Sequence, residues 1–140
     1  MPAWLLLALL VTPIRPDPRI TPGAMLPVTQ AQVCAHGYAT TVRHVPVSEK
    51  RAVFQAYGIR PSGRFEIDHL ISLELGGSNA IANLWPQSYH TRPWNAHVKD
   101  ALEDRLHALV CRGTLTLPAA QAAIRADWIA AYRQYVRRTP

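Results

Sequence analysis

The sequence predicts an α+β fold in which helices dominate and a β-hairpin is followed directly by a helix. Residues 64–75 alternate imperfectly between apolar and polar side chains and end at Gly76-Gly77-Ser78-Asn79, which is a hairpin signal. Residues 83–87 are the short returning segment. Two stretches with helical spacing of apolar residues follow it. Strand, tight turn, strand and helix make a ββα unit, with additional helices packed around it.

The helices are predicted from their capping residues and their apolar spacing. Upstream of the hairpin, Ser48 can cap a helix over 49–57 that ends at Gly58, and 40–43 resembles a short strand. Downstream, Asn95 can cap a helix that runs to about residue 111 and ends before Gly113. Its apolar face consists of Val98, Leu102, Leu106, Leu109 and Val110. A last helix opens near Pro118, and its expected buried stripe is Ile124, Trp128, Ala131 and Tyr135.

The N-terminus carries an apolar run over 1–11. The run is too short to span a bilayer but matches the hydrophobic region of a secretory signal peptide. We therefore assign 1–24 to a leader, 25–33 to an extended linker and 34–138 to one domain, and we expect export to the periplasm or the cell exterior. Translation from Met25 is the alternative and would leave the domain without a leader.

Two cysteines, Cys34 and Cys111, lie far apart in the chain and outside any CxxC pair. This spacing disfavours a zinc site and favours one long-range disulfide, which is typical of an oxidising compartment. Such a bridge closes most of the domain into a loop and stabilises it by about 4 kcal/mol. The alternative is two buried free thiols.

The composition describes a compact, basic chain. Hydrophobic residues make up 49% and charged residues 17%, which excludes a disordered tail. Lys and Arg number 15 against 9 Asp and Glu, so the net charge is +6. A basic domain suits a nucleic-acid partner, because each neutralised phosphate releases counterions, although an ordinary basic surface gives the same count.

The dipeptide Asp68-His69 is the centre of the functional hypothesis. It places a hard-metal ligand beside a possible general base at the end of the first predicted strand. The Gly-Gly turn begins seven residues after His69, and Asn83 lies fourteen after it. A ββα unit brings the end of its first strand against the first turn of its helix, where Asn95, His97 and Lys99 supply polar candidates.

These residues resemble a known family. The stretch from Glu66 to Asn79, together with Asn83-Leu-Trp-Pro, is similar to the HNH endonuclease motif, the ββα-metal or His-Me finger. The chain is more closely similar to a group of small, exported bacterial HNH-like proteins. The wider pattern that carries this likeness is Val28-Thr-Gln30, Cys34, Gly37-Tyr38, Tyr57-Gly58, Lys99-Asp100 with Glu103, Val110-Cys111 and Asp127-Trp128.

The resemblance implies a metal-dependent endonuclease that hydrolyses phosphodiester bonds of DNA, with RNA as an alternative substrate. His69 is then the general base that takes a proton from the attacking water, and Asp68 binds one divalent cation, Mg²⁺ or Mn²⁺. Asn83 holds the hairpin closed and orients His69, or else caps its own turn as asparagines often do.

The second metal ligand of the motif departs from the usual spacing. Nine residues after Asn83 stands Arg92, which cannot coordinate a cation. A slightly longer loop moves this role to His97, which we favour, or to Asn95, which is also the expected helix cap. His90 in the intervening loop is a further candidate. A variant with Lys99 would place a cation near the phosphate in place of the second ligand.

Four basic residues flank the proposed site and are candidates for nucleic-acid contacts: Arg64, Arg92, Lys99 and Arg105. No base-reading element is evident, so we expect little sequence specificity. Two other functions stay open. One is a catalytically degenerate HNH-fold module that binds nucleic acid or protein, and the other is a disulfide-stapled structural domain. We expect no membrane span, and the sequence leaves the oligomeric state open.

Overall fold

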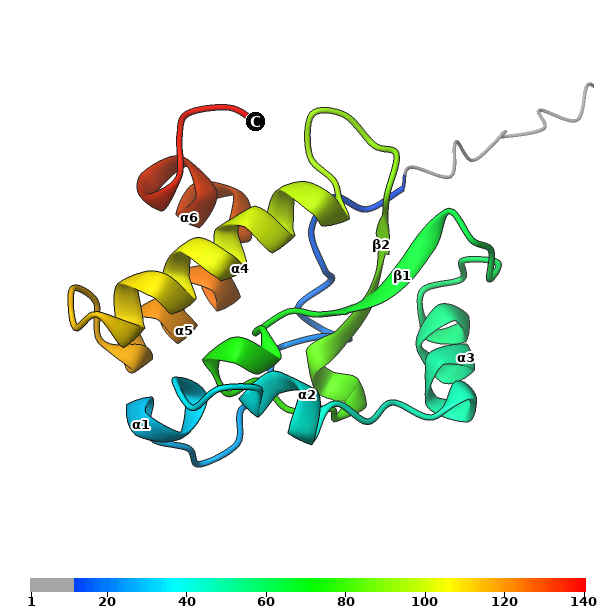
Figure 1. The fold of residues 1–140 in the computed structure, drawn as a ribbon. Helices are drawn as coiled ribbons and strands as arrows, with labels where there is room; N and C mark the ends of the chain where they lie inside the picture. The colour runs from blue at the N-terminus through cyan, green and yellow to red at the C-terminus, as the bar shows by residue number, and fades with distance from the viewer. Residues whose placement is uncertain (1–11) are drawn as a thin grey trace, which may run out of the picture.

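A computed structural model describes residues 12–140 and confirms a mixed fold of helices and a two-stranded antiparallel sheet (Figure 1). The apolar run at 1–11 lies outside the described residues. The elements are α1 Gln30–Val33, α2 Tyr38–Val42, α3 Val47–Ala56, β1 Phe65–His69, β2 Leu84–Ser88, α4 Ala96–Cys111, α5 Leu117–Ala126 and α6 Trp128–Tyr135. Helices α4, α5 and α6 gather on one side of the hairpin and α3 on the other (Figure 1).

The hairpin is shorter than predicted, and the connection between its strands is longer. Asp68 pairs with Trp85 and His69 with Leu84. After His69 the chain leaves the sheet, because Ser72 caps a single 3₁₀ turn, Leu73–Leu75. A Cβ on Gly77 would lie 1.7 Å from the carbonyl oxygen of Ile71, so only glycine allows the chain to fold back this closely. The Gly-Gly pair therefore lies within a long, compact loop between the strands and does not form a two-residue turn.

Helix α4 follows its prediction, whereas the C-terminal helix is divided. The Asn95 side chain accepts a hydrogen bond from the Val98 amide at 3.1 Å and caps α4 as expected. The single helix predicted from Pro118 is wrong, because Asp127 adopts an extended backbone and caps α6 through the amides of Ile129 and Ala130. As a result Tyr132, and not Tyr135, joins the buried stripe.

The strand predicted at 40–43 is also wrong. Residues 38–42 form the short helix α2, which begins after Gly37 in the left-handed region at φ +75°. Its two threonines have a high β propensity, which is why the sequence predicts a strand here. In the structure they are exposed on a short helix, where no neighbouring strand is available for them to pack against. The helix predicted over 49–57 is present as α3, shifted by about two residues toward the N-terminus.

The main apolar core lies among α4, α5 and α6. Trp94 packs edge-on against Trp128 and Tyr132, with ring centroids 5.8 Å and 5.5 Å apart. Leu102, Leu106 and Ile124 are fully buried in the same cluster. This core anchors α4 firmly beside the hairpin, so the residues on the hairpin-facing side of α4 are held in place.

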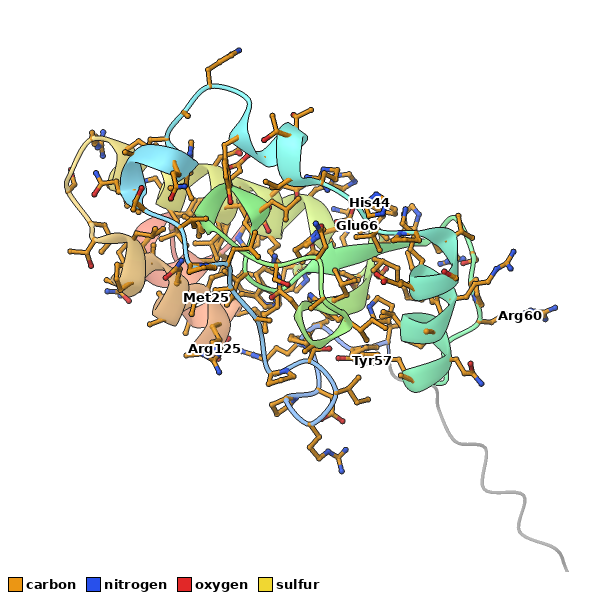
Figure 2. The ribbon with its side chains drawn as sticks, turned by 90° about the horizontal axis from the view of Figure 1, so that it is seen from below. Met25, His44, Tyr57, Arg60, Glu66 and Arg125 are labelled. Carbon is orange, nitrogen blue, oxygen red and sulfur yellow. A yellow bond between two sulfur atoms is a disulfide. The ribbon has the colours of Figure 1, made fainter. Side chains whose placement is uncertain are left out.

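Residues 12–24 pack against the domain. The Trp128 indole donates to the carbonyl of Ile14 at 2.8 Å, and Arg15 forms an ion pair with Asp127. Thr21 is buried and donates its hydroxyl to the Leu84 carbonyl. Figure 2 shows Tyr57 beside this segment, where its hydroxyl accepts from the Asp17 amide. The leader boundary at residue 24 stays a prediction, while the linker predicted over 25–33 gives way to helix α1 at Gln30.

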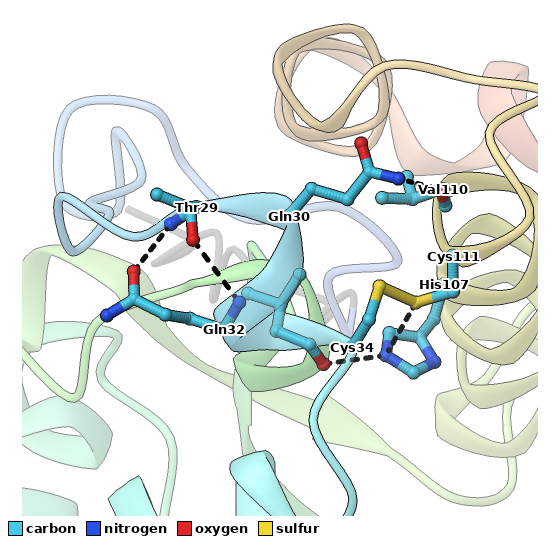
Figure 3. The surroundings of a disulfide bond; sticks show 8 residues. Thr29, Gln30, Gln32, Cys34, His107, Val110 and Cys111 are labelled. Atoms are coloured by element: carbon cyan, nitrogen blue, oxygen red, sulfur yellow. Dashed lines mark hydrogen bonds between the residues drawn. A yellow bond between two sulfur atoms is a disulfide. The ribbon is translucent and has the colours of Figure 1, made fainter.

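The predicted disulfide between Cys34 and Cys111 is present and joins α1 to the end of α4 (Figure 3). His107 lies one helical turn before Cys111, and its Nε2 is 2.9 Å from the carbonyl oxygen of Val33. A disulfide is compatible with an exported protein. Within residues 12–140, no helix has the length and apolarity that a membrane crossing requires.

Candidate functional site

A polar cavity of about 260 Å³ opens at the end of β1, between the hairpin and α4. Four carboxylates and two basic side chains supply its charged groups: Glu66, Asp68, Asp100, Glu103, Arg43 and His69. Glu66 and Asp68 lie on the same face of β1 because side chains alternate along a strand. Asp100 and Glu103 are three residues apart on α4 and therefore share a face of that helix.

His69 is oriented by Asn79, which lies in the loop between the strands. The Nε2 atom of His69 is 3.0 Å from Oδ1 of Asn79. The amide nitrogen of Asn79 donates to the carbonyl of Val42, and Oδ1 also accepts from the backbone amide of His44. The carbonyl of Val42 can only accept, so the amide orientation is defined. His69 therefore donates through Nε2, and Nδ1 carries the lone pair in the neutral ring.

The surroundings of His69 favour its neutral form. The residue is 5% exposed, and this burial lowers the pKa of His69 below its usual value. The nearby charge of Arg43 acts in the same direction, while the hydrogen bond to Asn79 and the charge of Asp68 oppose it. A neutral imidazole with a free Nδ1 is able to accept a proton near neutral pH.

Asn83 braces the loop that follows β1. Its side chain is fully buried, accepts from the Ile71 amide at 3.0 Å, and donates to the carbonyls of Ile71 and Ser78. The predicted role of holding the hairpin closed fits these contacts. No hydrogen bond joins the side chain of Asn83 to His69; the residue that orients the imidazole is Asn79.

Lys99 is completely buried under the cavity. Its Nζ lies 2.7 Å from Oδ2 of Asp68, 2.5 Å from Oε1 of Glu103 and 2.7 Å from the carbonyl oxygen of His69. Burial alone would lower the pKa of Lys99, but the two carboxylates raise it above its usual value. Lys99 is therefore a charged ammonium that donates to the His69 carbonyl and to Glu103 and forms an ion pair with Asp68.

The carboxylates of the cavity repel one another. Burial raises the pKa of Glu66, Asp100 and Glu103, and the charge of Asp68 raises each of them further. Oδ2 of Asp68 is buried and accepts no hydrogen bond of regular geometry, although it lies beside the Lys99 ammonium. Carboxylate oxygens are the ligands that Mg²⁺ and Mn²⁺ prefer, so the cavity has the right donor type for such an ion, although in residues 12–140 no three of these side chains bring ligand atoms within 4.8 Å of one another.

The three histidine and asparagine candidates for the second ligand lie away from Asp68. The side chain of Asn95 is occupied, since Oδ1 caps α4 and Nδ2 donates to the Thr91 carbonyl. His97 is exposed and its ring packs against Tyr89 at 5.3 Å. His90 is exposed, and neither histidine lines the cavity. The side chain that reaches Asp68 from α4 is Lys99.

The predicted nucleic-acid contacts are only partly available. Arg64, Arg92 and Arg105 are exposed, but none of them lines the cavity, and Arg105 donates to the Tyr135 carbonyl. The fourth predicted contact, Lys99, is not available to nucleic acid in this structure, because its side chain is buried and paired with Asp68 and Glu103. The arginine at the cavity is Arg43, which sequence reasoning placed in a strand.

Sequence reasoning also gave no chemistry to Asn79, Glu66, Asp100 and Glu103. The sequence indicates only a turn at Asn79, and no local pattern connects this residue with His69. The ion pair between Lys99 and Glu103 could have been predicted, because opposite charges four residues apart on a helix favour such a pair.

One group of three possible metal ligands lies within 4.8 Å in residues 12–140: Cys34, His107 and Cys111. The group could hold a metal ion, but its two sulfurs are joined in the disulfide. Thiolate and imidazole ligands select softer ions than the Mg²⁺ or Mn²⁺ expected at Asp68.

Comparisons of the chain with protein-family models, with curated proteins and with solved structures gave no match.

Proposed function

We propose that this protein is a metal-dependent endonuclease of the ββα-metal type that hydrolyses phosphodiester bonds in DNA or RNA. The observation that carries the proposal is His69: a buried, neutral imidazole, held by Asn79 with Nδ1 free, beside a cavity lined by carboxylates and Arg43. The order of elements supports the proposal, because two antiparallel strands, β1 and β2, are followed by helix α4.

In the reaction, water attacks the phosphorus and one P–O ester bond of the backbone breaks. Nδ1 of His69 takes the proton from the attacking water as the new P–O bond forms, and the departing oxygen gains a proton from solvent. The guanidinium of Arg43 binds a non-bridging phosphate oxygen. Asn79 keeps Nε2 protonated and thereby keeps the lone pair on Nδ1.

A divalent cation would be held by Asp68, with Glu66 and Asp100 as further carboxylates that line the same cavity. When bound, it supplies positive charge that stabilises the phosphate and the leaving oxygen during displacement. Without it, the carboxylates of the cavity would repel the backbone phosphates of the substrate.

Plasmid nicking in the presence of Mg²⁺ or Mn²⁺ tests the proposal. The wild-type chain should convert supercoiled plasmid to nicked and linear forms, and His69→Ala should lower the rate by a factor of about 10²–10⁴. His36→Ala is the matched control, because His36 is exposed and does not line the cavity. Equal cleavage by wild type and His69→Ala would reject His69 as the base, and cleavage that persists in EDTA would reject the metal.

A second candidate is a catalytically degenerate module that binds nucleic acid or protein. It is favoured by the buried ammonium of Lys99, which stands where the motif expects a second metal ligand. Nucleic-acid binding that persists without any cleavage, in wild type as well as in His69→Ala, would support this candidate over the enzyme.

A further inference from the structure

We propose that Lys99 is a built-in counter-ion of the site, so that a divalent cation binds at Asp68 only in competition with the Lys99 ammonium. The inference rests on the proposed function only in assuming that Asp68 faces a divalent ion. It gives Lys99 a role different from the phosphate or nucleic-acid contact that the sequence suggests.

The first argument is the coordination of the ammonium. A lysine ammonium has three protons, and Nζ of Lys99 has three oxygens within 2.7 Å, from Asp68, Glu103 and the His69 backbone. Two carboxylates and one carbonyl are also a suitable partial ligand set for a hard divalent cation. The cluster is therefore a cation site that already contains its cation.

The second argument is burial. The Lys99 side chain is 1% exposed, and those of Asp68 and Glu103 are 10% and 14% exposed. A charge this deeply buried is retained only when it is paired, because an isolated one would lose its hydration without compensation. Lys99 is thus held at this position by the carboxylates, and it cannot rotate into solvent without leaving them unpaired.

The third argument is charge balance on the cavity side. Glu66 and Asp100 line the same cavity and have no basic partner within 4 Å in the described chain. Asp68 lines this cavity and also pairs with Lys99, so its charge is shared between the ammonium and any ion in the cavity. Neutralising Lys99 should strengthen the pull of Asp68 on that ion, since like charges repel at short range.

The test measures Mn²⁺ binding to the full chain by electron paramagnetic resonance of the free ion, without reference to cleavage. Lys99→Met keeps the length of the side chain and removes its charge, and it should bind Mn²⁺ at least about tenfold more tightly than wild type. Lys50→Met is the matched control, because Lys50 is the other lysine of the chain and is exposed on α3. Its Mn²⁺ affinity should equal that of wild type.

A folding defect in Lys99→Met would not end the test. The double variant Lys99→Met/Glu103→Gln removes one charge of each sign, and it should bind Mn²⁺ more tightly than Glu103→Gln alone. Unchanged or weaker binding in either comparison would overturn the inference. The two proposals fail separately: tighter Mn²⁺ binding without any cleavage refutes the nuclease alone, whereas Mn²⁺-dependent cleavage with unchanged affinity in Lys99→Met refutes the counter-ion alone.

Discussion

Replacing Asn83 with alanine should be among the most destabilising single changes in the chain. The substitution leaves the amide of Ile71 and the carbonyls of Ile71 and Ser78 without the partners they have at 3.0, 3.0 and 2.9 Å. Each buried polar group left unpaired costs about 1–3 kcal/mol, and relaxation of the loop reduces the sum, so we expect a loss of about 3–5 kcal/mol. For a chain of this size the melting temperature should fall by about 10–15 °C.

Urea denaturation followed by tryptophan fluorescence measures this loss, because the chain has four tryptophans. Asn95→Ala is the control: it removes an asparagine whose side chain caps α4 at a partly exposed position, and should cost about 1 kcal/mol. If Asn83→Ala lost no more stability than Asn95→Ala, Asn83 would not be the brace of the loop. Asn83→Asp should also be strongly destabilising, because it removes both donated bonds and buries a charge.

Three other perturbations have defined outcomes. The pKa of His69 lies below its ordinary value of 6.5, so the cleavage rate should stay level around pH 7 and fall only below pH 6.5. A fall in kcat/KM that begins above pH 6.5 would contradict the role of His69 as the general base. Cys34→Ser/Cys111→Ser removes a bridge that spans 77 residues and should lower the free energy of unfolding by about 4–5 kcal/mol in urea. A chain that begins at Met25 should melt at a lower temperature than one that begins at Thr12, since it lacks the contacts of Ile14, Arg15 and Thr21; equal melting temperatures would show that residues 12–24 are dispensable.

The sequence predicted the elements whose signals are local. Asn95 caps α4 because an asparagine side chain can reach the amide three residues on, and this is visible in any sequence that places it before an apolar periodic run. The division between α5 and α6 was not predicted, because Asp127 interrupts neither the apolar spacing nor the helix propensity strongly. Asp127 caps α6 through the local amides of Ile129 and Ala130, and it also pairs with Arg15, which comes from a segment more than a hundred residues away.

The candidate site was predictable only in part for the same reason. Asp68 and His69 are adjacent in the chain and form a recognisable pair, whereas the contact of His69 with Asn79 depends on how the long loop after β1 folds back. That path is set by Gly77 and Asn83, whose tertiary contacts have no local signature. Likewise, the register of α4 against the hairpin decides that Lys99, and not His97, faces Asp68.

The charge distribution connects the site with the whole molecule. The chain carries a net charge of +6, which favours approach of a polyanion to its surface. The cavity has the opposite sign: four carboxylates stand against Arg43 and the buried Lys99, which leaves two negative charges when all are ionised, as many as one divalent cation neutralises. Attraction at the surface and repulsion at the cavity would separate binding from cleavage, so nucleic-acid binding should not require the metal while cleavage should. The same balance explains why Lys99 matters, because an ammonium that already compensates Asp68 reduces the charge that would draw a divalent ion into the cavity.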